Sequence, residues 1–266
     1  MADTKQLRSR IRSVRSTLQL THAMELVASS KIRRALEKKE NSAAYADAFE
    51  KAMSVLGASR ACRKSPWLEE REGGITSLVV IAGDRGLAGG YNANVFRLAR
   101  AWPDADITPI GKRACERFGG PMVHAETFSE AQASALAHIL CEDFLEGRCD
   151  RLGILYTRFV SVMSQVTQIR WILPLTRKEE PAPSDIVFEP DERQILDAAV
   201  PAYVSGMLMA AVRESFASEV AARRIAMNSA GKNAQQMIDD LQLEYNRARQ
   251  SAITQEITEI VAGGNA

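Results

Sequence analysis

Helix-breaking residues are distributed very unevenly along this chain of 266 residues. Residues 1–56 contain neither glycine nor proline, and all nine prolines lie between Pro66 and Pro201. Residues 202–262 contain no proline and only two glycines. Because proline and glycine are unfavourable inside helices, both ends of the chain are predicted to be long helices, and a compact domain is expected between them.

The N-terminal stretch, residues 1–57, has the apolar spacing of a coiled-coil helix. Leu7, Ile11, Val14 and Leu18 recur at intervals of 4, 3 and 4 residues, which places them on one face of a helix. A helix of this length measures about 80 Å, so its apolar stripe needs a partner. The stretch also carries 11 Lys and Arg against 6 Asp and Glu. Its candidate basic face for an acidic partner consists of Arg8, Arg12, Lys31, Arg33 and Arg34.

The C-terminal stretch, residues 200–262, has a matching seam. Its apolar residues are spaced by 3, 4, 3 and 4 positions at Ile238, Leu241, Tyr245, Ala248 and Ala252. Pro201 is expected to start this helix, since proline is tolerated at the first helical position, and Gly231 is expected to bend it. The two ends are predicted to pair as an antiparallel intramolecular coiled coil; pairing of each end with its copy in a homodimer is the alternative. Apolar residues at the tip, Ile253 and Ile257, would then need cover from another protein.

Between the two helices, residues 75–190 are predicted to form a Rossmann-like α/β domain. Short β-branched runs alternate there with amphipathic segments in the order β-α-β-α-α-β-β, and the last two strands are expected to form a hairpin. Residues 67–74 are interpreted as a polar linker, and residues 179–190 as an exposed connection. The predicted strands are 75–82, 106–110, 151–162 and 166–173, and the predicted helices are 88–102, 112–118 and 129–145.

A glycine-rich turn follows the first predicted strand, and turns between a strand and a helix can bind phosphate through backbone N–H groups. The spacing matches neither GxxxxGK[ST] nor GxGxxG. The turn is therefore interpreted as structural, packing a helix closely against a strand, and a Rossmann-type enzyme is the less favoured alternative. Its glycines are Gly83, Gly86, Gly89 and Gly90.

Other candidates for catalytic or metal chemistry are weaker still. His138 and Cys141 lie one helical turn apart but lack the two further ligands that zinc needs, and no GxSxG motif or carboxylate pair stands out. No catalytic residue, metal or cofactor is therefore expected. The four cysteines are widely spaced without a CxxC pair, which is typical of reduced thiols in a reducing compartment.

The sequence predicts no signal peptide and no membrane-spanning helix. No apolar run follows Met1, as a signal peptide would require. The longest uncharged run, residues 198–212, is shorter than the roughly 20 apolar residues that cross a bilayer.

Several stretches resemble the gamma subunit of F-type ATP synthases, and together they span nearly the whole chain. The most specific is 245–261 (YNRARQSAITQEITEIV), which is close to that family's C-terminal signature. The segments 7–14 (LRSRIRSV) and 23–31 (AMELVASSK) resemble its first helix, and 84–90 (DRGLAGG) resembles its glycine turn.

The resemblance implies a central rotor shaft that carries torque between the membrane c-ring and the catalytic alpha/beta hexamer, coupling proton transport to ATP synthesis or hydrolysis. The implied partners are the alpha, beta and epsilon subunits and the c-ring, with no nucleic acid. Nucleotide and magnesium would bind the alpha and beta subunits, and this chain would hold no cofactor. Membrane association would be peripheral, through the c-ring, at the cytoplasmic face of a bacterial plasma membrane.

The resemblance also implies which side chains contact the beta subunit. The matching positions are Met24, Arg249, Gln250, Thr254 and Glu256. At His22, Val220 and Arg224 the sequence departs from the residues usual in the family, which leaves the details of coupling open.

A reading from a different class is a basic coiled-coil protein that binds nucleic acid through the first helix. It predicts binding that weakens steeply with salt. Against it, Glu25 and Glu37 interrupt the basic residues of that helix.

Overall fold

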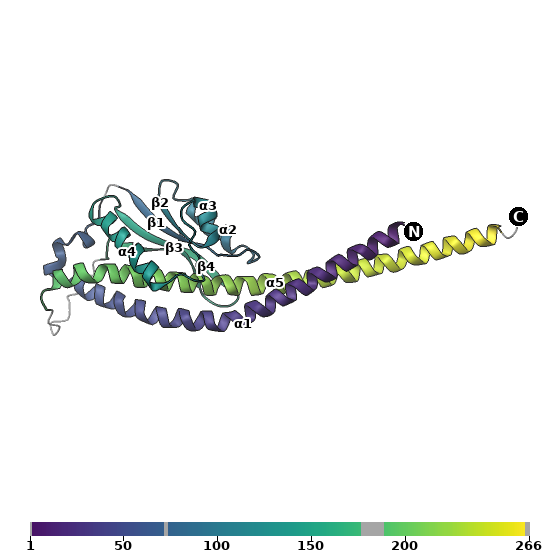
Figure 1. Cartoon of the computed structure of the whole chain (residues 1–266), viewed down its shortest axis with the longest axis horizontal. Coiled ribbons are helices and arrows are strands. Elements are labelled where there is room, and N and C mark those ends of the chain that lie inside the picture. Colours follow the sequence, from purple (N-terminus) through teal and green to yellow (C-terminus); the bar gives the residue numbers. More distant parts are fainter. Residues whose placement is uncertain (1, 72–73, 177–188, 264–266) are drawn as a thin grey trace. The chain divides into compact units, whose positions relative to one another are not determined.

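The computed structural model of the chain (Figure 1) describes residues 2–71, 74–176 and 189–263, without the side chains of 2–4, 256 and 259–263. The chain divides into two compact units. Unit 1 comprises Met1–Ser29 and Arg223–Ala266, and unit 2 comprises Ser30–Ala222. Two long helices, α1 (Ala2–Ala58) and α5 (Glu192–Gly263), contribute to both units. The division therefore falls inside the helices, whereas the predicted domains end where the helices end.

In unit 1 the two helices pair in antiparallel fashion, as predicted. Asn228 Nδ2 on α5 donates to Glu25 Oε1 on α1 at 3.0 Å, and further along α5 Gly231 faces Thr21 and Leu18. Residue numbers thus rise on α5 as they fall on α1. The seams with alternating spacings of 3 and 4 are buried or half-buried at Ile11, Val14, Leu18, Thr21 and Ala28 on α1 and at Ala234, Ile238, Leu241, Tyr245 and Ala248 on α5.

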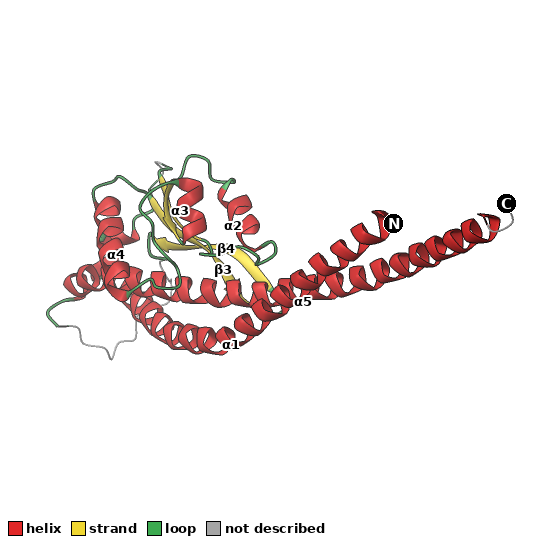
Figure 2. Cartoon of the chain, turned by 45° about the vertical axis from the view of Figure 1, so that its right-hand side comes forward, coloured by secondary structure: helices red, strands yellow, loops and turns green. Residues whose placement is uncertain are grey.

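Unit 2 contains a mixed sheet of four strands in the order β2-β1-β3-β4 (Figure 2). The central strand β1 (Thr76–Ile81) is buried throughout and runs parallel to β2 (Asp106–Ile110) and β3 (Arg151–Phe159). The edge strand β4 (Gln165–Leu173) is antiparallel to β3. This arrangement confirms the Rossmann-like α/β domain with an antiparallel addition.

Helices cover both faces of this sheet (Figure 1). On one face, α2 (Tyr91–Ala99) and α3 (Lys112–Phe118) enclose a small core around Leu78 and Val80. On the other face, α4 (Glu130–Leu145) and the unit 2 parts of α1 and α5 enclose the larger core. In unit 2 the long helices are again antiparallel. Ser42 of α1 contacts Arg213 of α5, whereas Ser59, directly after the end of α1, contacts Glu192 at the start of α5.

The start of α5 differs from the prediction that Pro201 begins it. The helix begins at Glu192 and Pro201 lies inside it. Asp191 supplies the missing start signal, because its Oδ1 accepts the N–H groups of Arg193 at 3.0 Å and Gln194 at 2.9 Å. Burial of Leu196 in the core then holds the first turns in place.

Two other predicted boundaries were too wide. Helix α2 does not include residues 88–90, because Leu87 and Gly89 have positive φ angles of 61° and 57° and extend the preceding turn. Strand β3 ends at Phe159, because the N–H groups of Val160 and Ser161 both bond to the carbonyl of Ser164 and close the hairpin.

In the part of the chain that the structure describes, one helical stretch, Glu192–Gln255 of α5, is long and apolar enough to cross a membrane. Its most apolar window is 56% buried inside the protein. Leu196, Val204 and Leu208 of this stretch are core residues of unit 2, so packing against the sheet accounts for its apolar character.

Candidate functional site

Helix α5 is joined to the sheet by polar side chains at a place where β1 has ended. The last residue of β3 paired with β1 is Leu155, so the next residues have an open edge. There the N–H of Thr157 donates to Ser215 Oγ at 3.3 Å, and Ser218 Oγ donates to the carbonyl of Thr157 at 3.0 Å. Side chains of α5 therefore take the place of a neighbouring strand and satisfy buried backbone groups.

Ser215 also joins α5 to α2. The hydroxyl of Tyr91, at the start of α2, donates to the carbonyl of Ser215 at 2.9 Å and lies 2.7 Å from Ser215 Oγ. Ser215 is fully buried, and hydrogen bonds are stronger in a low-dielectric interior than in water. One serine thus connects α2, β3 and α5.

Glu219 packs closely against Gly83. This buried side chain lies against the glycine turn, and its Cδ is 2.7 Å from the position that a Cβ on Gly83 would occupy. Real Cβ atoms do not approach other atoms so closely. The glycine turn therefore lets α5 pack directly against the end of β1, as the structural interpretation expects.

The polar groups of the turn are used within unit 2. The N–H of Gly83 donates to Asn92 Oδ1 at 2.9 Å. Asp84 accepts N–H groups from Lys112 at 2.9 Å and from Glu126 at 2.8 Å. A phosphate here would meet the carboxylates of Asp84 and Glu219 and would find the N–H of Gly83 taken, which weighs against a nucleotide site in this turn.

The remaining glycines of the turn have different surroundings. Gly89 has a positive φ of 57°, a conformation that favours glycine. Gly90 directly precedes α2. A Cβ on Gly86 would meet Arg113 Nη2 at an ordinary 3.6 Å, so this glycine is not required by packing.

The candidates for beta-subunit contact fall into two separate patches of unit 1. Met24 is 39% exposed on α1. Arg249, Gln250 and Thr254 are exposed on α5, where Thr254 Oγ1 donates to the carbonyl of Gln250 at 2.9 Å. The antiparallel register places Met24 opposite the region of Asn228, roughly 30 Å along α5 from Arg249 at 1.5 Å per residue. The side chain of Glu256 lies outside the described residues.

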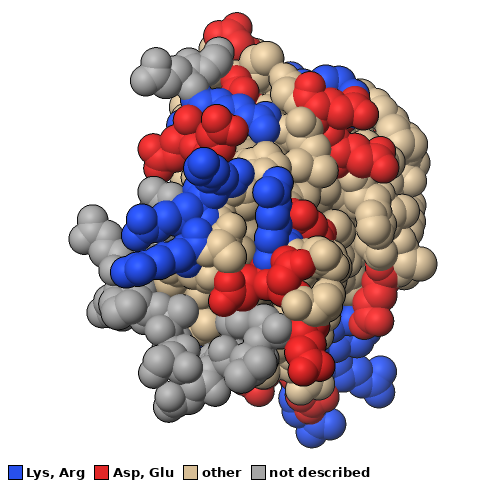
Figure 3. Space-filling view, turned by 90° about the vertical axis from the view of Figure 1, so that its left-hand side faces the viewer, with Lys and Arg blue, Asp and Glu red and all other residues tan. Residues whose placement is uncertain are grey.

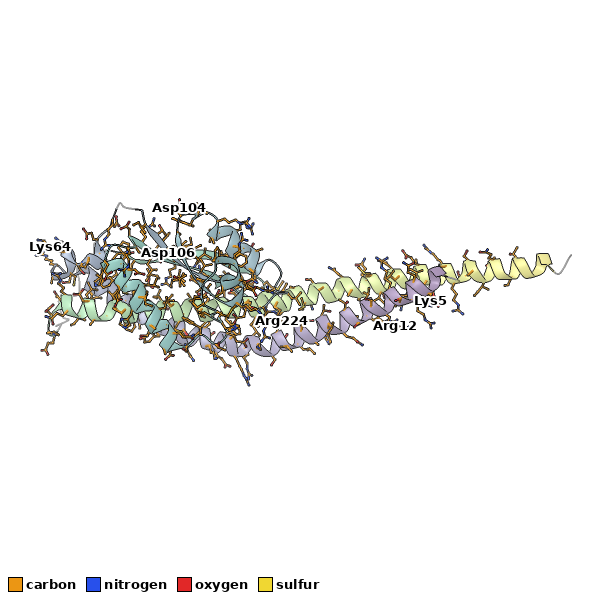
Figure 4. The ribbon with its side chains drawn as sticks, turned by 45° about the horizontal axis from the view of Figure 1, so that its top comes forward. Lys5, Arg12, Lys64, Asp104, Asp106 and Arg224 are labelled. Atoms are coloured by element: carbon orange, nitrogen blue, oxygen red, sulfur yellow. The ribbon has the colours of Figure 1, made fainter. Side chains whose placement is uncertain are left out.

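The candidate basic face of α1 is divided in the same way. Arg8, Arg12 and Arg34 are exposed and form no ion pair with the described residues; Figure 4 labels Arg12 on α1. Lys31 Nζ instead lies 2.5 Å from Glu126 Oε1, and Arg33 pairs with Glu37 at 3.7 Å. Part of the basic face is therefore neutralised within the chain.

The three positions that the resemblance marks as unusual have distinct surroundings. Val220 is buried at 1% exposure and suits an apolar site. His22 is exposed, with Nδ1 4.0 Å from Glu25 Oε2. Arg224 is half-buried on α5 (Figure 4).

The residues that join α5 to the sheet were not singled out from the sequence. Ser215, Ser218 and Glu219 share one side of a helix through spacings of 3 and 4 residues. The available signal was a group of polar residues at helical spacing on a face that is otherwise apolar, with Leu208, Ala211 and Val212 before it and Ala222 after it. Its partners, Tyr91 and Thr157, are far away in the sequence and could not be inferred.

The cysteines and acidic residues do not form a reactive or metal-binding cluster in the part of the chain that the structure describes. All four thiols are free and buried. Burial raises the pKa of Cys141 to about 12, and burial also raises the pKa of Cys62 and Cys149. No group of three His, Cys, Asp or Glu residues could hold a metal ion among the described residues.

The charges on one face of the molecule are of both signs. Figure 3 shows Lys and Arg side chains beside Asp and Glu side chains on that face. Nucleic-acid interfaces usually present a patch of a single, positive sign, so this face does not favour the nucleic-acid alternative.

Comparison with known proteins gives a consistent result. A family model described as ATP synthase matches residues 3–266. Among solved structures, the Tetrahymena thermophila mitochondrial ATP synthase (central stalk/c-ring) contains a chain with TM-score 0.64 and 22% identity, covering 79% of this chain and 99% of that one. Two Euglena gracilis mitochondrial ATP synthase structures contain similar chains. The chain in the rotor structure has TM-score 0.64 and 17% identity, and the match covers 95% of this chain and 99% of that one. The chain in the OSCP/F1/c-ring structure has TM-score 0.67 and 18% identity, and the match covers 100% of this chain and 94% of that one.

Proposed function

Because the chain belongs to the gamma-subunit family of ATP synthases, we propose that it is the central rotor shaft of an F-type ATP synthase. In this role it transmits torque between the membrane c-ring and the catalytic alpha/beta hexamer, and so couples proton transport to ATP synthesis or hydrolysis. Its partners are the alpha, beta and epsilon subunits and the c-ring. It is a peripheral protein at the cytoplasmic face of a bacterial plasma membrane, held there through the c-ring.

The observation that carries this proposal is the continuity of α5 between two kinds of contact. Within unit 2, Ser215 and Ser218 fix the helix to the sheet through buried hydrogen bonds. Within unit 1, the same helix, which has 72 residues in all, is paired along its seam with α1. A force applied to the sheet can therefore reach the helix pair without crossing a flexible loop, as torque transmission requires.

The chain is proposed to hold no catalytic site, nucleotide or magnesium ion of its own, these being properties of the alpha and beta subunits. In support of this assignment, the side chain of Glu219 packs against Gly83 in the glycine turn of unit 2, and the carboxylate of Asp84 in the same turn accepts the N–H of Glu126. Arg249, Gln250 and Thr254 are proposed to contact beta subunits, because they are exposed and belong to the segment that most resembles the family signature.

The proposal is tested by expressing the tagged full chain and measuring the mass of the assembly purified through the tag. Alpha and beta subunits are expected in that assembly, together with epsilon and, in detergent, the c-ring. A chain that never copurifies with alpha and beta would end the proposal. Titration with duplex DNA at low salt separates the nucleic-acid alternative, which requires binding that disappears as salt rises.

A further inference from the structure

Both long helices are attached to one loop of unit 2 near the places where they leave that unit. The division between the units falls after Ser29 on α1 and after Ala222 on α5. Lys31 of α1 and Glu219 of α5 lie close to that division. Each of these side chains is connected to the glycine turn that follows β1, but in a different way.

The connection of α5 to the turn is direct. The side chain of Glu219 is buried and packs against Gly83. Protein interiors are closely packed and transmit strain. A shift of α5 relative to the turn therefore meets resistance at this contact.

The connection of α1 passes through the segment between α3 and α4. Asp84 of the turn accepts the N–H of Ala125 at 3.0 Å and the N–H of Glu126 at 2.8 Å. The N–H of Gly111 donates to the carbonyl of Val123 at 2.9 Å. The Asp84 side chain is only 9% exposed, so these bonds are sheltered from water. The backbone of Glu126 is therefore fixed to the turn.

The carboxylate of Glu126 bridges α1 and the turn. Lys31 Nζ of α1 donates to Glu126 Oε1 at 2.5 Å, and Arg85 Nη2 of the turn donates to Glu126 Oε2 at 3.4 Å. The side chains of Lys31 and Glu126 are 37% and 33% exposed. A pair that is partly shielded from water is screened less than a fully exposed one.

This charged contact differs in kind from the apolar contacts of α1 beside it. Ala28, Ile32 and Ala35 are buried along the seam of α1. Hydrophobic contacts are non-directional, so small apolar side chains resist separation more than sliding. Charge-assisted hydrogen bonds have a defined geometry. The bond between Lys31 and Glu126 therefore fixes the position of α1 along and around its axis.

We propose that Glu126 is a positioning residue of the shaft. It holds α1 in a fixed register on the same turn that Glu219 of α5 contacts, so that both helices move with unit 2 where they leave it. The inference rests on the proposed function, because a fixed register affects activity only if the helix pair carries torque.

The contact itself is tested in the free full chain by amide hydrogen exchange. Glu126→Gln removes the charge and keeps the shape of the side chain. The amides of residues 31–35 are expected to exchange about two- to five-fold faster, as the loss of a partly exposed ion pair predicts. Amides of α2 serve as an internal reference. Unchanged exchange of residues 31–35 would overturn the inference.

Glu116→Gln is the matched control for the loss of one carboxylate. Glu116 is 40% exposed and pairs with Lys112 and Arg113 inside α3, so it connects no two elements. This variant is expected to leave exchange of residues 31–35 as in the wild type. Faster exchange in both variants would show an effect of net charge and would overturn the specific role of Glu126.

The positioning role is tested in the assembly purified through the tag and returned to vesicles. The measured quantity is ATP-driven proton pumping divided by ATP hydrolysis. Glu126→Gln is expected to lower this ratio while the yield of assembly stays normal, whereas a general loss of stability would lower the yield. Glu116→Gln should leave both unchanged. A normal ratio in Glu126→Gln would overturn the positioning role.

A double-mutant cycle shows whether Lys31 acts through Glu126. Lys31→Met should lower the ratio, and the double variant Lys31→Met, Glu126→Gln should lower it no further than the more severe single variant. If the two effects multiply instead, Lys31 and Glu126 act independently and the inference is wrong.

The outcomes separate this inference from the rotor proposal. If alpha and beta subunits copurify and the ratio is normal in Glu126→Gln, the positioning role fails and the rotor proposal stands. If alpha and beta subunits never copurify, the rotor proposal fails and the positioning role fails with it. Amide exchange in the free chain then still decides whether Glu126 holds α1.

Discussion

Glu219 and Gly83 meet so closely that a side chain at position 83 cannot fit beside the glutamate as it stands. The Cδ atom of Glu219 lies 2.7 Å from the place of a Cβ on Gly83, and its Oε1 lies 2.9 Å from that place. The glutamate is buried and cannot simply turn into solvent. This contact holds α5 against the end of β1, and it can be tested directly.

Replacing Gly83 by alanine is expected to lower the free energy of unfolding by about 1–3 kcal/mol, because the added methyl overpacks a buried site. Gly86→Ala is the control, since its Cβ would meet only Arg113 Nη2 at 3.6 Å, and its effect should stay within about 0.5 kcal/mol. Urea unfolding of both variants measures the difference. Equal stabilities would contradict the close contact.

The connection of α2 to α5 through Tyr91 and Ser215 predicts energetic coupling. Tyr91→Phe and Ser215→Ala should each cost about 1–3 kcal/mol of unfolding free energy, since each leaves a buried partner without its hydrogen bond. The double variant should cost less than the sum by about 0.5–3 kcal/mol. A double-mutant cycle in urea gives this coupling, and strict additivity would show that the two hydroxyls act independently.

Gly206 and Gly231, both inside α5, should respond differently to alanine. A Cβ on Gly231 would meet Thr21 Oγ1 at 3.6 Å and Leu18 Cδ1 at 3.8 Å, which are ordinary contacts. Gly231→Ala should therefore stabilise the helix pair of unit 1 by about 0.5–1 kcal/mol through helix propensity. Gly206→Ala should gain less or lose stability, because its Cβ would lie 2.8 Å from Tyr45 Cε1. Amide hydrogen exchange measures the stability change of Gly231→Ala in unit 1 and of Gly206→Ala in unit 2. A larger gain from Gly206→Ala than from Gly231→Ala would refute the packing argument.

Removal of the exposed Arg249 and Gln250 side chains should impair coupling more than assembly. The double variant Arg249→Ala, Gln250→Ala is expected to enter the complex at normal stoichiometry, because neither side chain is buried within this chain, but to lower ATP-driven proton pumping. Asn246→Ala with Arg247→Ala, also exposed on α5, is the control and should pump normally. Unchanged pumping in the first variant would remove these residues from the proposed contact.

Stability should fall at alkaline pH because of Cys141. Burial raises the pKa of this thiol from 9.0 to about 12, so the unfolded chain loses the proton first as pH rises. The contribution is full below pH 9 and is lost between pH 9 and 12, amounting to about 4 kcal/mol at 1.36 kcal/mol per pKa unit. In Cys141→Ala the decline of stability with pH should be shallower. The decline that remains comes from Cys62, Cys149, Tyr156 and Tyr203, whose pKa values burial also raises. Identical slopes would argue against the buried thiol.

The long helices could be predicted because the apolar spacing that specifies them lies within each helix's own sequence. The seams at Ile11, Thr21, Ile238 and Leu241 repeat every three or four residues, and that spacing alone fixes which side of each helix is buried. The start of α5 was predicted at Pro201, because proline is favoured at the first position of a helix. The helix instead begins after Asp191, whose side chain caps it. Burial of the first turns of α5 stabilises them as helix, and this burial depends on the tertiary fold rather than on local sequence.

Contacts between residues that are distant in the sequence could not be predicted. Trp67 was assigned to a polar linker, yet it is buried, stacks on Phe144 at 5.9 Å and donates to Asp197 Oδ1 at 2.8 Å. Its partners are distant in the sequence, and so are those of Ser215. Polar residues of this kind have no local pattern that distinguishes them from exposed ones, because their environment is created only by the fold.

The burial of all four cysteines has a practical consequence for watching this molecule work. A single cysteine introduced on an exposed turn of α5 would be the fast-reacting thiol toward a maleimide dye at neutral pH, since the native ones are enclosed. The wild-type background could then carry a fluorescent reporter without prior removal of its own thiols, and angular motion of the chain could be followed by single-molecule polarisation.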